Sequence, residues 1–172
     1  FLADFSRRKV FMDNKTRLYR YIFIANIPIF VFGFLIKLNW TGFSESNFRG
    51  LFSIAIISIF SALLLALAEI LGKRKKMFSD INLKDIIFIG VSQSLAIFPG
   101  VSRSGITLTS ALFSGIERKT AAKFSFLVGI PAISITGVVE LFTIFKTTSL
   151  ILILPTIIGI ISSLISSIFA ID

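Results

Sequence analysis

Cysteine and histidine are both absent from the 172 residues of the sequence. The absence of cysteine excludes disulfides and thiol chemistry. The absence of histidine removes the commonest general base and metal ligand. Charged residues are also scarce, at 16% of the chain, whereas an average soluble domain has about 25%. Because so few polar groups cannot cover the surface of a soluble domain, that class of protein is excluded.

Apolar residues are abundant and come in long runs. They make up 55% of the chain, and the mean hydropathy is +0.91. Uncharged runs cover residues 21–36, 50–68 and 147–171, and a bilayer core requires about 20 mainly apolar residues per helix. The sequence therefore predicts an all-α, polytopic membrane protein. We expect a single transmembrane domain over residues 1–172, with spanning helices at about 18–38, 50–71, 124–145 and 150–170.

The net charge of +9 comes from basic residues that gather between the apolar runs. Most of the 18 lysines and arginines lie in three clusters, at 7–20, 73–84 and 118–123. Such clustering is typical of the cytoplasmic loops of membrane proteins, so we predict that all three clusters are cytoplasmic. Basic residues there favour anionic lipid head groups. The expected partner is therefore the lipid bilayer and not a nucleic acid.

Residues 86–116 contain an interruption that the other apolar segments lack. Apolar stretches at 86–98 and 106–116 are separated by the sequence PGVSRSG. A helix of 13 residues rises only about 20 Å, which is too short to cross a bilayer, and basic clusters lie on both sides. We therefore predict a re-entrant helical hairpin over about 86–116. A basic loop is expected at 6–20, and Ser79 and Asp80 are expected to cap the inbound helix.

The interruption has the composition of an anion site. An arginine at membrane depth, here Arg103, is costly unless it faces a cavity or a partner. Gly100 and Gly105 let the backbone N–H groups approach a ligand. A new helix begins after Gly105, and a helix N-terminus attracts anions. Guanidinium, hydroxyl groups and free amides together suit a phosphate or a pyrophosphate.

Two simpler interpretations stay open on the residues alone. PGVSRSG could be a surface loop with Arg103 in water, although the shortness of both flanking segments disfavours it. Gln93, on the inbound arm, has a helix–helix hydrogen bond as its simplest role.

The stretch from Gly90 to Thr107 also resembles a known signature. It reads Gly90-Val-Ser-Gln93-Ser-Leu-Ala96-Ile-Phe-Pro99-Gly-Val-Ser-Arg-Ser-Gly105-Ile-Thr107 and is followed by matching residues at 115–118 and 122–131. The order is similar to the second signature of the undecaprenyl-diphosphatase, or bacitracin-resistance, family. The resemblance extends over nearly the whole chain, and its specific core is residues 90–131.

The resemblance implies an enzyme of the bacterial plasma (inner) membrane, built from two inverted halves that each contribute a re-entrant hairpin. It would hydrolyse undecaprenyl pyrophosphate, recycle the carrier lipid for peptidoglycan synthesis and confer bacitracin resistance, with its active site open toward the periplasm. Arg103 would clamp the pyrophosphate, with Ser102 and Thr107 as catalytic hydroxyl partners. The substrate-binding residues implied by the resemblance lie in the loop or on the inbound arm: Ser104, Gly100, Gly105 and Gln93.

The family's first signature, which supplies two glutamates, a serine and a histidine, is not present in these residues. We therefore expect Phe1 to be an internal residue of a longer protein, and this chain alone to be inactive. The resemblance leaves room for a divalent metal ion, whose carboxylate ligands would come from the N-terminal half. No metal ligand is assigned in this chain, and its sequence fixes no oligomeric state.

Two other function classes compete with the hydrolase. A transporter or flippase for a lipid phosphate or another anion also has broken helices at the midplane of the membrane, and an anion clamp serves binding as well as hydrolysis. Phosphate release would separate the two. The hypothesis of a structural or assembly subunit does not explain why an arginine lies in a glycine-flanked loop within the membrane.

Overall fold

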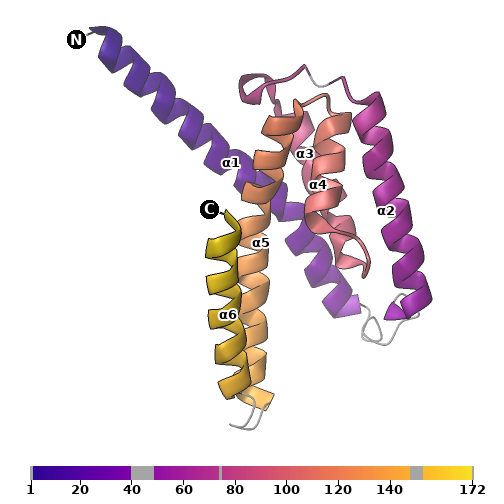
Figure 1. Cartoon of the computed structure of the whole chain (residues 1–172). Helices are drawn as coiled ribbons and strands as arrows, with labels where there is room; N and C mark the ends of the chain where they lie inside the picture. The colour runs from indigo at the N-terminus through magenta and orange to yellow at the C-terminus, as the bar shows by residue number, and fades with distance from the viewer. Residues whose placement is uncertain (1, 40–48, 74, 148–152, 172) are drawn as a thin grey trace. The chain divides into compact units, whose positions relative to one another are not determined.

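The computed structural model describes the backbone of residues 2–39, 49–73, 75–147 and 153–171, and the side chains of 16–39, 49–73, 75–142 and 155–169. These residues form α-helices and two short 3-10 turns, without a strand among them, which confirms the predicted all-α fold (Figure 1). The elements in chain order are α1 (Leu2–Asn39), α2 (Leu51–Leu71), η3 (Phe78–Asp80), α3 (Leu83–Gln93), η4 (Ser94–Ile97), α4 (Arg103–Phe113), α5 (Arg118–Thr147) and α6 (Ile153–Ile171).

Three helices in the described part of the chain are long and apolar enough to cross a membrane. Their spans are Thr16–Asn39, Leu51–Leu71 and Arg118–Phe142. The apolar part of α6 that the structure describes, Pro155–Phe169, is shorter. Many large apolar side chains on these helices are exposed, among them Phe23, Phe52 and Phe126. Exposed apolar side chains on long helices are expected where lipid is the solvent.

The chain divides into two compact units, Phe1–Ala132 and Ile133–Asp172. The first unit contains α1 to α4 and the first half of α5, and it holds every candidate site residue. The second unit contains the rest of α5 and α6. The described side chains of α6 are mostly exposed, and many of them are isoleucine or serine.

The expected basic loop at 6–20 is wrong, because the helix α1 runs through it without a break. No proline or glycine lies between residues 2 and 20, so nothing in this stretch interrupts a helix that continues beyond its apolar part. The basic side chains before Thr16, and Arg74 in the second cluster, lie outside the described side chains.

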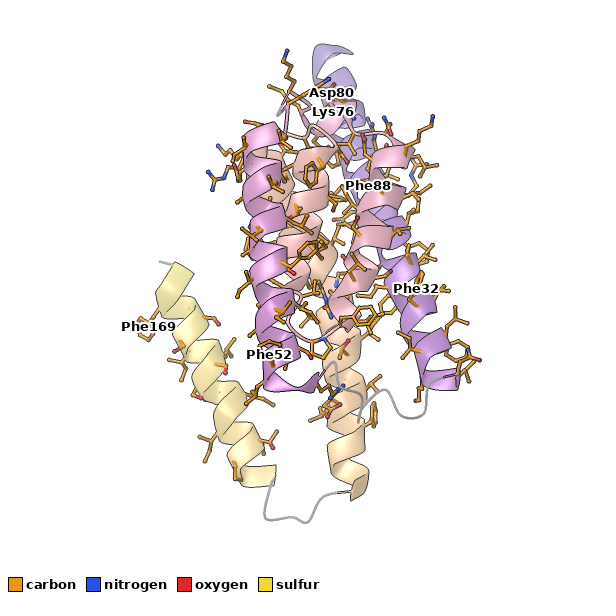
Figure 2. All side chains as sticks on the ribbon, turned by 90° about the vertical axis from the view of Figure 1, so that its right-hand side faces the viewer. Phe32, Phe52, Lys76, Asp80, Phe88 and Phe169 are labelled. Carbon is orange, nitrogen blue, oxygen red and sulfur yellow. The ribbon has the colours of Figure 1, made fainter. Side chains whose placement is uncertain are left out.

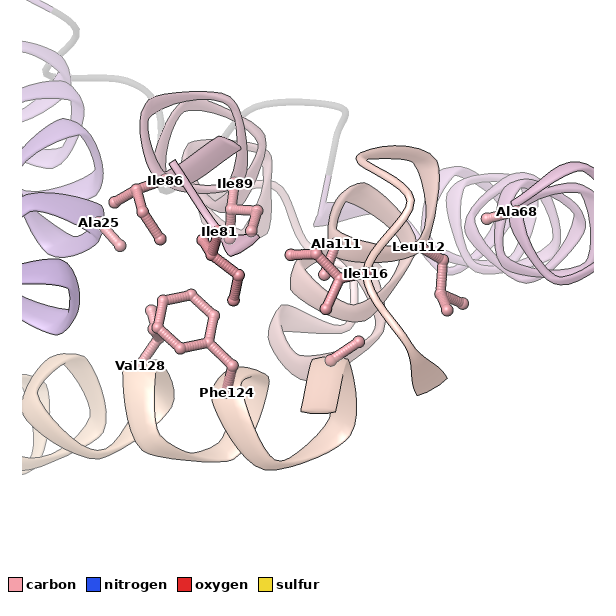
Figure 3. Packing of buried hydrophobic residues seen from close by; sticks show 11 residues of the cluster. Ala25, Ala68, Ile81, Ile86, Ile89, Ala111, Leu112, Ile116, Phe124 and Val128 are labelled. Atoms are coloured by element: carbon pink, nitrogen blue, oxygen red, sulfur yellow. The ribbon is translucent and has the colours of Figure 1, made fainter. Parts of the chain in front are cut away.

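The core of the first unit lies between α5 and the two short helices. Phe124 and Val128 of α5 face Ile81 and Ile86 (Figure 3), and all four are buried. Ala111, Leu112 and Ile116 extend this cluster along α4 toward Ala68 of α2. The core therefore fixes the base of the α3–α4 pair, because its residues come mainly from the ends of the pair that are remote from the interruption.

The two loops that frame the α3–α4 pair are hydrogen-bonded to each other. The backbone N–H groups of Lys75 and Lys76 both donate to the Gly115 carbonyl at 2.9 Å, and Glu117 N–H donates to the Lys76 carbonyl at 2.8 Å. Arg118 also pairs with Glu69 at 3.2 Å. The chain between these loops thus leaves and returns to the same end of the first unit. Figure 2 shows Lys76 and Asp80 at this end and Phe52 near the opposite end.

The cap of α3 is Asn82 and not the expected pair Ser79 and Asp80. Asn82 Oδ1 accepts from the Asp85 N–H at 3.0 Å, and Asp85 Oδ2 accepts from the Asn82 N–H at 3.1 Å. This reciprocal arrangement is a capping box, and it satisfies two helix-end donors. Asp80 instead accepts from the Met77 N–H at 3.0 Å and closes the turn η3. Lys76 further anchors Asp85 by an ion pair at 2.9 Å.

The helices α1 and α3 touch through small residues. A Cβ built on Gly90 would lie 2.7 Å from the Ala25 carbonyl oxygen, which is closer than real Cβ atoms come to such an oxygen. Gly90 is therefore needed for this contact, as is typical where membrane helices approach closely.

We predict that Gly90→Ala separates α1 from α3 and lowers the stability of the fold by about 1–3 kcal/mol, the usual cost of overpacking. Gly33→Ala, on α1, is the matched control because a Cβ added at Gly33 would meet nothing within 4 Å. It should be neutral or slightly stabilising. Thermal denaturation in detergent micelles measures both, and equal midpoints for the two variants would contradict the close contact.

Candidate active site

The residues between the two short helices form a tight turn that α2 holds in place. We call residues 98–105 the tip. Val101 N–H donates to the Phe98 carbonyl at 3.2 Å, and Gly100 has a φ of 96°, a conformation that favours glycine. A Cβ on Gly100 would also lie 2.7 Å from the Ile54 carbonyl oxygen. Ser58 Oγ donates to the Gly100 carbonyl at 3.1 Å, so α2 contacts the tip at its sharpest point.

Ser102 caps the outbound helix α4. Its Oγ accepts from the Gly105 N–H at 3.2 Å, and its carbonyl accepts from the Ile106 N–H at 2.8 Å. A Cβ on Gly105 would lie 3.1 Å from Ser102 Cβ and 3.2 Å from its Oγ, so glycine at 105 leaves room for the cap. Ser104 Oγ lies 3.5 Å from Ser102 Oγ, and both serines are exposed. The first N–H groups of α4 and these hydroxyls therefore share one open face.

Arg103 is the first residue of α4 and is partly buried. In the part of the chain that the structure describes, its Nε and Nη1 atoms are buried without a hydrogen-bond partner. Buried donors without an acceptor are rare in folded proteins, because each one costs free energy. An anion with several acceptor oxygens would satisfy them, and guanidinium binds such groups with two parallel hydrogen bonds.

Thr107 lies one turn inside α4 and not on the open face. Only 1% of it is exposed. Its Oγ1 lies 2.9 Å from the Arg103 carbonyl and 3.1 Å from the Ser104 carbonyl, as a donor to the first turn of the helix. The structure thus brings together Ser102, Arg103 and Ser104, and it places Thr107 behind them as a support of the turn.

Gln93, at the end of α3, makes a helix–helix hydrogen bond. Its side chain is fully buried, and its Nε2 donates to Asn26 Oδ1 on α1 at 3.2 Å. Asn26 in turn donates from Nδ2 to the Ile22 carbonyl at 2.8 Å and to the Val128 carbonyl of α5 at 3.1 Å. This is the simpler role that the sequence left open for Gln93. Asn26 was missed, although an asparagine inside the uncharged run 21–36 is a signal for a polar contact between membrane helices.

An apolar groove lies between α2 and the segment that runs from η4 through the tip to the start of α4. Its volume is about 440 Å³. The lining side chains are apolar except for one serine: Ile56, Ile57, Phe60, Ser61, Leu64, Leu95, Phe98, Val101 and Ile106. Val101 and Ile106 flank the polar residues 102–105 directly in the sequence, so the groove begins where the polar face ends.

The described residues do not fit a metal ion. They contain no group of three or more histidine, cysteine, aspartate or glutamate side chains that could hold one. Asp85 and Glu69 are paired with Lys76 and Arg118 near the base of the α3–α4 pair. No chemical step at the tip is therefore assigned to a metal held by these residues.

Comparison with known proteins places the whole chain in one family. Residues 1–172 match the family described as "Bacitracin resistance protein BacA". The undecaprenyl-diphosphatases of Prochlorococcus marinus strains NATL2A and NATL1A are 69% and 68% identical to it over 172 residues, 100% of this chain and 62% of each relative. That of Synechococcus sp. strain CC9311 is 44% identical over 166 residues, 96% of this chain and 59% of the relative. The chain thus spans about three fifths of the length of these relatives.

We predict that Ser102→Ala frays the first turn of α4, because the variant loses the side-chain cap, which is typically worth about 1 kcal/mol. Ser104→Ala is the control, since Ser104 is exposed in the same turn and does not cap the helix. Amide hydrogen exchange at Gly105 measures the effect. It should accelerate several-fold in Ser102→Ala only, and equal exchange in both variants would contradict the assigned cap.

Proposed function

The chain belongs to the bacitracin resistance protein BacA family, and on that premise we propose that the protein containing it hydrolyses undecaprenyl pyrophosphate to undecaprenyl phosphate and phosphate. This activity recycles the carrier lipid for peptidoglycan synthesis and accounts for bacitracin resistance. The names of the matched relatives support the proposal. Its expected partners are this lipid substrate and the bilayer.

The observation that carries the proposal is the contact between a polar tip and an apolar groove. The tip offers guanidinium donors that have no partner among the described residues, two exposed hydroxyls and a helix N-terminus. The groove beside it is lined almost wholly by apolar side chains. A lipid pyrophosphate has a charged head that suits the tip and a hydrocarbon tail that suits the groove. A free anion would leave the groove without a use, and an uncharged lipid would leave Arg103 unpaired.

The chemistry that these residues can supply is stabilisation of charge. Arg103 and the first N–H groups of α4 are fixed donors, and two of the Arg103 nitrogens are buried, where donors stabilise a developing charge more than they do in bulk solvent. Phosphoryl transfer depends mainly on such stabilisation and on positioning. Ser102 by itself is a weak nucleophile, because a serine needs an adjacent base. The attacking group, serine or water, and its base are therefore not assigned to this chain.

The chain is part of a multi-pass membrane protein, and we propose an orientation in the bacterial plasma (inner) membrane. The clusters at 73–84 and 118–123 contribute to the base of the α3–α4 pair, where the loops at 75–76 and 115–117 are joined. The positive-inside rule makes this end cytoplasmic. Each short helix has 11 residues and rises about 16 Å, so the tip lies well inside the membrane. We propose that it opens toward the periplasm.

A transporter or flippase for a lipid phosphate remains the second candidate, because broken helices that meet inside the membrane are typical of transporters. Release of phosphate from undecaprenyl pyrophosphate by a purified, family-length protein supports the hydrolase. Movement of the intact lipid between leaflets without phosphate release would support the transporter instead.

In a family-length protein containing this chain, Arg103→Ala should lower kcat/KM by about 10- to 150-fold, because a charge-assisted contact is worth about 1.5–3 kcal/mol. Arg103→Lys should recover little, since a lysine cannot reproduce the two parallel bonds of a guanidinium. Arg118→Ala is the matched control, because Arg118 is also the first residue of a helix, α5, but already pairs with Glu69. Phosphate release measures all three. A parental rate in Arg103→Lys would show that Arg103 is not a bidentate clamp.

The proposed orientation predicts that positions 75 and 119 face the same side of the membrane. These 172 residues contain no cysteine, so Lys75→Cys and Lys119→Cys each place one thiol in this chain for an impermeant reagent. Both should be labelled in inside-out vesicles and neither in intact cells. Labelling of the two positions from opposite sides would rule out the re-entrant hairpin over 86–116.

A further inference from the structure

Three helices meet at one pair of buried amides below the tip. Asn26 of α1 and Gln93 of α3 are joined by the 3.2 Å bond from Gln93 Nε2 to Asn26 Oδ1, and Asn26 reaches α5 through the Val128 carbonyl at 3.1 Å. Asn26 is 2% exposed and Gln93 is 0% exposed. We call this pair the amide lock. Asn26 and Gln93 are 67 positions apart in the chain, and Asn26 and Val128 are 102 positions apart.

The lock holds the end of α3, from which the chain leads into the tip. Gln93 is the last residue of α3, the 3-10 turn η4 (Ser94–Ile97) follows it directly, and the tip begins after η4. Among the described residues, Gln93 Oε1 has no partner, so the bond to Asn26 is the side-chain hydrogen bond that fixes Gln93 there. Gly90, one turn before Gln93, packs closely against Ala25, the residue before Asn26. A buried amide finds no water to replace a lost partner, so its geometry is strongly preferred.

We propose that Asn26 is a positioning residue: through Gln93 it fixes the end of α3 and so the place at which the tip presents Arg103. Asn26 does not belong to the tip and acts on it through Gln93. Its effect on turnover rests on the proposed function, whereas its effect on the tip's mobility does not. A purely structural asparagine would contribute to stability alone, so a test has to separate stability from positioning.

Protection of a buried thiol in η4, the turn that joins α3 to the tip, measures how firmly the end of α3 is held without any need for activity. Ser94 follows Gln93 and is 6% exposed, and its hydroxyl donates to the Gly90 carbonyl over a long 3.4 Å, so Ser94→Cys should be tolerated and slow to label. In this background, Asn26→Leu should accelerate labelling several-fold. Ser110→Cys, buried near the base of α4, should stay protected and thereby exclude global unfolding.

Asn39→Leu is the matched control variant. Asn39 lies on the same helix and makes the same type of bond, from its Nδ2 to the carbonyl four residues earlier at 2.9 Å, but it is exposed. Labelling of Ser94→Cys should be unchanged in Asn39→Leu. Equal labelling in the Asn26→Leu and Asn39→Leu backgrounds would overturn the proposal.

The double variant Asn26→Leu/Gln93→Leu separates the two roles and covers the case in which the single variant fails to fold. Removing both partners leaves no unpaired buried amide of this pair, so much of the thermal stability should return. Protection of Ser94→Cys should not return, because apolar contacts lack the direction of the hydrogen bonds. Recovery of stability and protection together would show that Asn26 is only structural.

In a family-length protein, Asn26→Leu should lower kcat/KM, because a misplaced Arg103 contacts the pyrophosphate less well both in the bound substrate and in the transition state. Asn39→Leu should keep the parental kcat/KM. A folded Asn26→Leu protein with parental kcat/KM would also overturn the proposal. A parent protein without phosphatase activity would instead contradict the proposed function, and the labelling comparison would still test the lock.

Discussion

Two helices of 11 residues, α3 and α4, rise only about 16 Å each and are too short to cross a hydrocarbon core of about 30 Å. In the re-entrant hairpin that we propose, the backbone stops inside the membrane and must satisfy its polar groups from the protein itself. Here α2 donates to the Gly100 carbonyl from Ser58, Ser102 caps α4, and the turn bonds Val101 to Phe98. The chain also has to return to the end of the unit at which α3 begins. The close contacts at Gly90 and Gly100 and the hydrogen-bonded loops at the base serve this return.

The same constraint creates the chemistry of the tip. At the start of α4, Arg103 is partly buried between the exposed residues Ser102 and Ser104, so an anion can reach its side chain and the first N–H groups of the helix. Two of the arginine nitrogens are buried and unpartnered in the described part of the chain, so the free site already contains the donors that a pyrophosphate would need. The adjoining apolar groove allows the rest of a lipid substrate to stay in a hydrocarbon environment.

Local features of the fold could be predicted from the sequence, whereas long-range contacts could not. The glycines at 100 and 105 and the break between two short helices are properties of neighbouring residues, and the structure shows a physical reason for each. The outbound helix was expected to begin after Gly105, and this is wrong, because Ser102 caps the helix and α4 begins at Arg103. The loop expected at 6–20 was wrong because basic residues do not by themselves end a helix. The α3 cap was assigned to Ser79 and Asp80, although the sequence Asn82–Asp85 offered a better capping box. The bond between Asn26 and Gln93 depends on tertiary packing, which no local pattern reveals.

The central claim is that the tip is where the charged head of a lipid pyrophosphate binds. The most direct measurement is amide hydrogen exchange of residues 98–107 in nanodiscs, with undecaprenyl pyrophosphate or with the uncharged alcohol undecaprenol. We predict slower exchange at Ser104 and Gly105 with the pyrophosphate, no such change with the alcohol, and no protection in the Arg103→Ala variant. Protection by both lipids alike, or protection confined to the base of α3 and α4, would contradict the claim.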